Sequence, residues 1–79
     1  GKPSLEEEMV KTEEVRTLQS CIAQLPHQEQ EIISLKFGAE MNNRQIAAML
    51  GLGESNVGTI IYRAVRKLRD KFTELQNGQ

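Results

Sequence analysis

The chain has 79 residues, with 10 lysines and arginines against 11 aspartates and glutamates, one histidine, one cysteine and no tryptophan. This length allows one small domain, residues 1–79, and the single cysteine excludes an internal disulfide. Cys21 and His27 are too few for a Cys/His zinc site, and no apolar stretch approaches the roughly 20 residues that span a bilayer. We therefore expect a cytoplasmic protein without a metal or other cofactor.

The charge is divided unevenly along the chain. Residues 1–40 carry four basic and eight acidic side chains, a net charge of −4, whereas residues 41–79 carry six basic and three acidic ones, a net charge of +3. Binding to a polyanion depends on the local field of one face rather than on the total. The total of −1 therefore does not exclude nucleic acid, although each charge run alone also fits a solvated helix face.

The first predicted helix covers about residues 5–24. Ser4 and Glu7 fit a capping box at its start. Apolar residues then recur at helical spacing, with Cys21 on their flank, and predict the buried side of this helix: Val15, Leu18, Ile22 and Leu25.

A second helix is predicted over about residues 26–37. Pro26 suits the first helical position, and Gly38 ends the helix. We expect Lys36 to extend its ammonium out of an apolar surrounding. The apolar residues cover more than half of the circumference and predict neighbours on both sides: Ile32, Ile33, Leu35 and Phe37.

Two further helices, within about residues 42–75, predict a helix-turn-helix. Asn42 and Gln45 fit an N-terminal capping box, and Gly51 suits the left-handed end of this short helix. After three turn residues, a long helix begins near Glu54, with this buried stripe: Val57, Ile61, Ala64, Leu68, Phe72 and Leu75. The whole chain is therefore expected to be all-α, a four-helix domain like the winged-helix-like and three-to-four-helix DNA-binding bundles.

The exposed face of the last helix favours DNA over plain solvent. At about 100° per residue, the side opposite the buried stripe carries Ser55, Thr59, Tyr62 and Arg66, with Arg63 and Arg69 beside them. Small hydrogen-bonding side chains near a helix N-terminus reach base edges, and arginines further along reach phosphates. A merely solvated face mixes glutamates and lysines, but residues 55–69 contain no acid.

The combined spacing of several segments resembles region 4 of bacterial RNA polymerase sigma factors, with the closer likeness to the extracytoplasmic-function group. The resemblance runs from about Leu18 to Phe72, most of the chain. It rests on Leu25-Pro26, residues 31–37, residues 45–52, Val57 and residues 62–69.

The resemblance implies a non-enzymatic C-terminal domain that directs transcription initiation. Such a domain reads the −35 element of promoter DNA, docks its first two helices on the flap of the polymerase β subunit, and acts as a monomer that an anti-sigma factor can bind. Arg44 would approach the DNA backbone from the third helix. The groove itself would be lined by residues of the fourth helix: Glu54, Ser55, Asn56, Thr59, Tyr62, Arg63, Arg66 and Lys67.

Three positions depart from the family pattern. Gly58 stands where the family usually has lysine or a similar polar residue, which removes a phosphate contact and costs about 1 kcal/mol of helix stability relative to alanine. Ile60, often arginine in the family, is either partly buried or touches a thymine methyl. Gly53 replaces a serine or threonine N-cap. We therefore expect modest DNA affinity from the isolated domain.

Two other functions stay open. One is the DNA-binding domain of a response-regulator-type (LuxR-like) transcription factor, which binds paired half-sites as a dimer, although residues 63–69 fit sigma factors better. The other is a sigma-like interaction module that binds only polymerase or an anti-sigma factor, which Gly58 and Ile60 suggest. An enzyme is not expected, because the sequence offers no Ser/His/Asp or Cys/His set.

Overall fold

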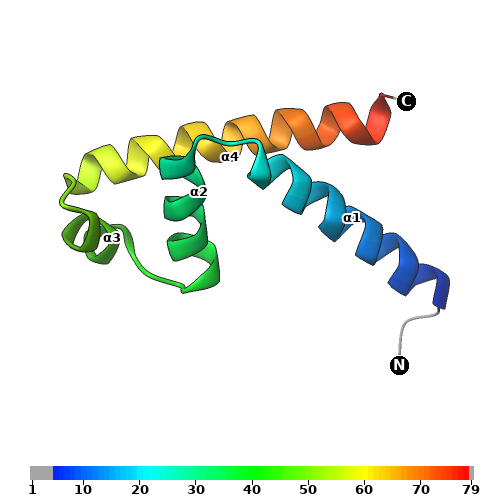
Figure 1. Cartoon of the computed structure of the whole chain (residues 1–79), viewed down its shortest axis with the longest axis horizontal. Coiled ribbons are helices and arrows are strands. Elements are labelled where there is room, and N and C mark those ends of the chain that lie inside the picture. Colours follow the sequence, from blue (N-terminus) through cyan, green and yellow to red (C-terminus); the bar gives the residue numbers. More distant parts are fainter. Residues whose placement is uncertain (1–4, 79) are drawn as a thin grey trace.

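Helices make up nearly all of the chain that the structure describes, and no strand occurs among these residues. The computed structural model describes residues 5–78, with side chains from Thr12 onward, so the predicted cap at Ser4 lies outside it. The helices are α1 (Leu5–Ala23), α2 (His27–Ile33), the π-helical turn η1 (Ser34–Gly38), α3 (Asn43–Leu50) and α4 (Glu54–Asn77). The predicted all-α class is confirmed (Figure 1).

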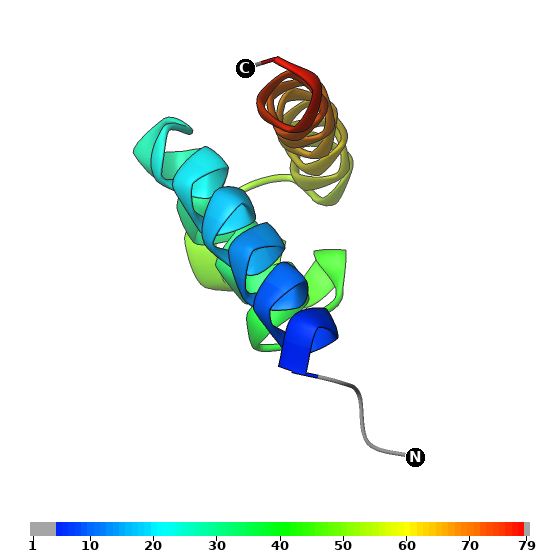
Figure 2. The same cartoon turned by 90° about the vertical axis from the view of Figure 1, so that its right-hand side faces the viewer.

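α1 packs on α4 only near its C-terminal end. Cys21 and Leu25 are buried there, whereas Val15 and Leu18 are 48% and 41% exposed. The expectation that Val15 and Leu18 are buried, with Cys21 on the flank, is therefore wrong. The reason is visible in Figures 1 and 2: the two helices diverge from their crossing, and crossed helices share a contact only near that point.

α2 begins one residue later than predicted, and the wider π-helical turn η1 directly follows it. Pro26 is the N-cap, with φ −53° and ψ 150°, instead of the first helical residue. Gly38 was expected to end the helix after residue 37, but it is the last residue of the helical turn, and the left-handed residue that reverses the chain is Glu40, with φ 56°. The N–H of Met41 then donates to the carbonyl of Leu35 over 3.0 Å and closes the widened end.

The π-helical turn also changes which residues face the core. Phe37 is 61% exposed, so its predicted burial is wrong. Because hydrogen bonds from residue i to i+5 widen the turn, the regular α-helical spacing no longer holds after Ile33. Lys36 is half-buried, and its ammonium reaches the side-chain oxygen of Asn43 over 2.9 Å, as expected for a cation that extends out of apolar surroundings.

The helix-turn-helix is formed by α3, residues 51–53 and the start of α4. Both hydrogen bonds of the capping box are present: Gln45 N–H to Asn42 Oδ1 over 2.8 Å, and Asn42 N–H to Gln45 Oε1 over 2.9 Å. Gly51 is left-handed with φ 70°, and the N–H of Leu52 returns to the carbonyl of Ala47 over 2.9 Å. The predicted cap and turn are therefore confirmed.

Two clusters of buried side chains hold α4 against the other helices. One joins α2, α3 and the first half of α4 through Ile32, Ile46, Ala47 and Val57. The other joins the loop between α1 and α2, α2 itself and the middle of α4 through Leu25, Ile33 and Ala64. Leu75 is 46% exposed, so its predicted burial is wrong. Toward its C-terminal end α4 runs past α2 and α3, and α1 diverges from it (Figure 1).

Candidate nucleic-acid interface

The rotation of α4 is fixed by two residues on its inner side. Val57 and Ala64 are both fully buried, and they lie seven residues apart, which is two helical turns. The opposite side of α4 therefore faces solvent, and Tyr62 in its middle is 67% exposed. This places the helix face that the sequence predicts for DNA on the outside of the molecule.

All of the predicted DNA-binding residues are exposed, but they do not all lie on one side of the helix-turn-helix unit. Arg44 is contributed by α3, and the others follow α4 from its first turn. The exposed residues are Arg44, Glu54, Ser55, Asn56, Thr59, Tyr62, Arg63, Arg66 and Lys67. Lys67 differs from the rest in its contacts.

The arginines of this surface carry charges that no acid among residues 12–78 neutralises. Residues 12–78 contain two ion pairs, and neither involves Arg44, Arg63 or Arg66. An unpaired guanidinium presents a fork of donors that matches the oxygens of a phosphate. The arrangement is therefore able to bind a polyanion without first breaking contacts within the domain.

Lys67 instead links α4 to α2. Its ammonium lies 2.9 Å and 3.1 Å from the two carboxylate oxygens of Glu29, whose side chain is only 16% exposed. At about 100° per residue, Lys67 also lies on the flank of α4 rather than beside Arg66. The structure thus separates Lys67 from the predicted set and makes it a contact between helices.

The hydroxyl of Thr59 is already used within α4. Its Oγ1 donates to the carbonyl of Ser55 over 3.1 Å, the usual backward bond of a helical threonine. In this arrangement the hydroxyl offers only its acceptor lone pairs to a ligand. Thr59 therefore suits a donor such as the amino group of adenine or cytosine.

The departures from the family pattern have clear structural positions. Gly58 is half-buried beside α3, and a Cβ there would lie 3.6 Å from Asn43 Nδ2, an ordinary contact. Ile60 packs against the cluster around Val57, so partial burial is confirmed. Gly53 caps α4 without a side-chain hydrogen bond.

Sequence reasoning missed the contacts that connect helices near this surface. Glu29 is 38 residues from Lys67, and Asn43 approaches Gly58 across the helix-turn-helix. Neither pairing leaves a periodic or local signal in the sequence. The sequence shows only that Asn43 directly follows the N-cap Asn42.

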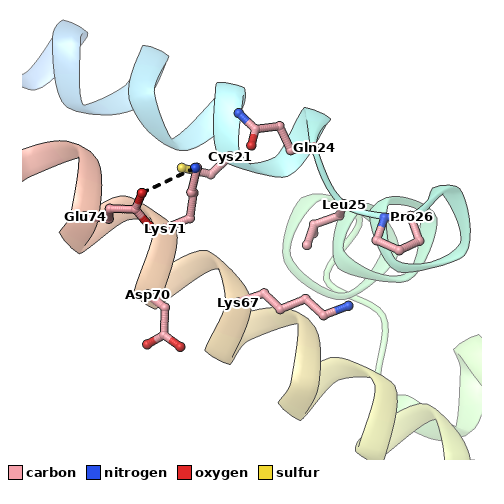
Figure 3. Close-up of a pocket in the computed structure, with 8 residues that line it drawn as sticks. All are labelled: Cys21, Gln24, Leu25, Pro26, Lys67, Asp70, Lys71 and Glu74. Carbon is pink, nitrogen blue, oxygen red and sulfur yellow. Dashed lines mark ion pairs between the residues drawn. The ribbon is translucent and has the colours of Figure 1, made fainter. Parts of the chain in front are cut away.

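A cavity of about 400 Å³ lies on the other side of α4, between this helix and the end of α1 (Figure 3). It contains two lysines and two acids, and Lys71 pairs with Glu74 over 3.7 Å. These charges balance, so the cavity does not continue the cationic surface. Its lining is Cys21, Gln24, Leu25, Pro26, Lys67, Asp70, Lys71 and Glu74.

The described part of the chain has neither a membrane-spanning helix nor a cluster of metal-ligating side chains. No helix there is long and apolar enough to cross a membrane. Among the same residues, no three His, Cys, Asp or Glu side chains gather in a way that would hold a metal ion.

This chain is similar to known proteins over most of its length. The family model described as Sigma-70, region 4 matches residues 16–68. RNA polymerase sigma factor FliA of Salmonella typhimurium is 36% identical over 55 residues, which are 70% of this chain and 23% of that protein. The same-named factor of Escherichia coli is 34% identical over 55 residues. The chain thus spans less than a quarter of the length of these relatives.

The region matched by the family model includes the whole helix-turn-helix and, on α4, the exposed Arg63 and Arg66. It begins in the middle of α1 and ends at Leu68, so it covers most of the chain. The closer likeness to the extracytoplasmic-function group stays a prediction. The capped α3, the glycine turn and the sequence match agree: this chain belongs to the sigma-70 region 4 family.

Proposed function

We propose that this domain recognises the −35 element of promoter DNA and directs transcription initiation as the C-terminal DNA-binding part of a sigma factor. The observation that carries the proposal is the exposed face of α4, which has no acid from Ser55 to Arg69 and where Arg63 and Arg66 are without ion-pair partners in the described structure. The family membership and the similarity to RNA polymerase sigma factor FliA support it.

The dimensions of α4 fit this role. Its 24 residues make a rod of about 36 Å, whereas the major groove is about 12 Å wide. The first turns therefore enter the groove, and the later turns cross one wall. Ser55, Asn56 and Thr59 then face base edges, and Arg63 and Arg66 face phosphates.

The same domain offers an apolar surface for a protein partner. Val15 and Leu18 on α1 are about half exposed, and Phe37 at the end of η1 is 61% exposed. Val15 and Leu18 lie about one turn apart on α1, so together they form an apolar patch of the kind that contacts other proteins. This supports docking of α1 and α2 on the β-subunit flap of the polymerase core, a surface that an anti-sigma factor would compete for.

The first prediction tests the DNA face directly. Replacing both Arg63 and Arg66 by alanine removes two phosphate contacts, so we expect roughly tenfold weaker binding to a −35-containing duplex. The slope of log affinity against log salt should also become shallower by about 1.8, because each contact contributes about 0.9. Fluorescence anisotropy at several salt concentrations measures both quantities.

Arg16→Ala is the matched control for this experiment, because Arg16 is an exposed α1 cation with no ion pair among the described residues. It should leave DNA affinity unchanged. An unaltered affinity in the double variant would exclude the α4 face. Binding as a dimer to paired half-sites would instead indicate the response-regulator-type function.

An NMR titration separates DNA recognition from a pure interaction module. A −35 duplex should shift amide signals in α3 and the first half of α4, and a β-flap fragment should shift those of α1 and α2. Shifts with the flap fragment but none with DNA would establish the interaction module and contradict promoter recognition.

A further inference from the structure

One flank of α4 is hollowed beside the proposed DNA face. This concavity of about 580 Å³ lies along the helix from Gly58 to Asp70. Tyr62, Arg66 and Arg69 border it, above an apolar floor that includes Ile61. We refer to it as the Gly58 concavity.

At one end the concavity is bordered by Gly58, which has no side chain to enter it. A lysine here, as in the family pattern, would project four methylenes and an ammonium into this space. In this chain the nearest atom is instead Asn43 Nδ2, 3.6 Å from the position of a Cβ. The oxygen of the same carboxamide accepts from Lys36 Nζ over 2.9 Å, so an amide donor and a fixed ammonium lie near the Gly58 end.

The two flanks of α4 differ in their available charge. At about 100° per residue, Gly58 and Arg69 lie on one side of Arg66, and Lys67 and Lys71 lie on the other. Lys67 and Lys71 are paired with Glu29 and Glu74. Within residues 12–78, Arg66, Arg69 and Lys36 have no carboxylate partner. On the flank of Lys67 and Lys71, both lysines are thus paired and only Arg63 is free among these residues, whereas the flank with the concavity offers Arg69 beside Arg66.

We propose that the Gly58 concavity receives the sugar–phosphate backbone of one DNA strand, and that Arg69 contacts this strand beside Arg66. This inference rests on the proposed function. Arg69 lies about 22 Å from the first residue of α4, beyond the width of about 12 Å over which a helix lies inside the major groove. A residue there meets the groove wall, where phosphates are the only charged groups.

Asp70 limits where the phosphate sits. Its carboxylate borders the concavity at the end away from Gly58, and it makes no ion pair in the described structure. Since two anions repel, the phosphate is held toward Tyr62 and Arg66. The hydroxyl of Tyr62, which is 67% exposed, adds a neutral donor on that side.

Arg69→Gln tests the inference, and Lys71→Gln is the matched control. Both remove one cation from the second half of α4, two residues apart, but Lys71 faces the opposite flank and already pairs with Glu74. We expect Arg69→Gln to weaken binding to a −35 duplex several-fold and to lower the salt slope by about 0.9. Lys71→Gln should change neither quantity.

The outcomes distinguish this inference from the function on which it rests. If the two glutamine variants have equal DNA affinities and salt slopes while the unaltered chain binds tightly, the DNA backbone does not occupy the concavity. Promoter recognition by the α4 face would still stand. A chain that does not bind DNA at all overturns both.

Gly58→Leu provides a second measurement. Leucine fills the concavity without adding charge, and it also favours the helix, so we expect a higher Tm together with weaker DNA binding. A higher Tm with unchanged DNA affinity would show that the DNA backbone does not enter the concavity.

Discussion

At the scale of single residues, the positive charge that this domain offers to a ligand depends on which cations have no ion-pair partner in the described structure. Arg63 and Arg66 are exposed and without ion pairs in the described structure, whereas Lys67 is held by Glu29. Arg63, Arg66 and Lys67 stand in one basic run of the sequence, and the sequence alone does not distinguish their roles. An ion pair across 38 residues removes one of them from the surface that DNA would meet.

Gly58→Lys is the prediction that belongs to this scale. The Cβ fits at an ordinary distance of 3.6 Å from Asn43 Nδ2, so a lysine is accommodated without displacing α3. Its ammonium adds a phosphate contact, and lysine removes about 1 kcal/mol of helix penalty. We expect tighter binding to a −35 duplex, a salt slope steeper by about 0.9, and a raised Tm. An unchanged or lower affinity would count against the alignment with the family at this position.

At the scale of elements, local sequence signals were most accurate where the residues that cap a helix end lie close to it in the sequence. Asn42, Gln45 and Gly51 were predicted from short-range rules and all three adopt the expected roles. The end of α2 shows the limit of such rules. There the π-helical turn displaces the reversal from Gly38 to Glu40, and Phe37 is turned away from the core.

Asn42→Ala tests how much the α3 cap contributes to stability. The substitution removes the acceptor for Gln45 N–H, and loss of such a cap costs about 1 kcal/mol. For a domain of this size that corresponds to a decrease in Tm of about 4–8 °C. Thermal unfolding followed by circular dichroism measures it, with the exposed Gln19→Ala on α1 as the control. A Tm equal to that of the control would mean that the cap adds no net stability.

At the scale of the whole molecule, the domain is extended. Its radius of gyration is 14.9 Å, whereas a compact domain of this length has about 12 Å. α1 accounts for the difference, because much of it projects beyond its contact with α4 (Figure 1). This leaves Val15 and Leu18 available to a protein partner on a surface away from the α4 arginines.

The double substitution Val15→Ser and Leu18→Ser tests this division of surfaces. Because both side chains are about half exposed, we expect little change in Tm. Binding to a β-flap fragment should weaken at least several-fold, since buried apolar area is lost at the interface, while affinity for the −35 duplex stays the same. Isothermal calorimetry with each ligand provides the comparison. Equal losses for both ligands would show that the two surfaces are not separate.

The sequence by itself determined the helices, the capped turn and the identity of the residues on the exposed face of α4. It could do so because these features depend on contacts within a few residues or on a regular helical repeat. Only the tertiary structure decided that Val15, Leu18, Phe37 and Leu75 are exposed and that Glu29 holds Lys67. Burial and ion pairing of this kind depend on where helices cross and where they diverge. That geometry is set by packing between distant segments, which no local pattern encodes.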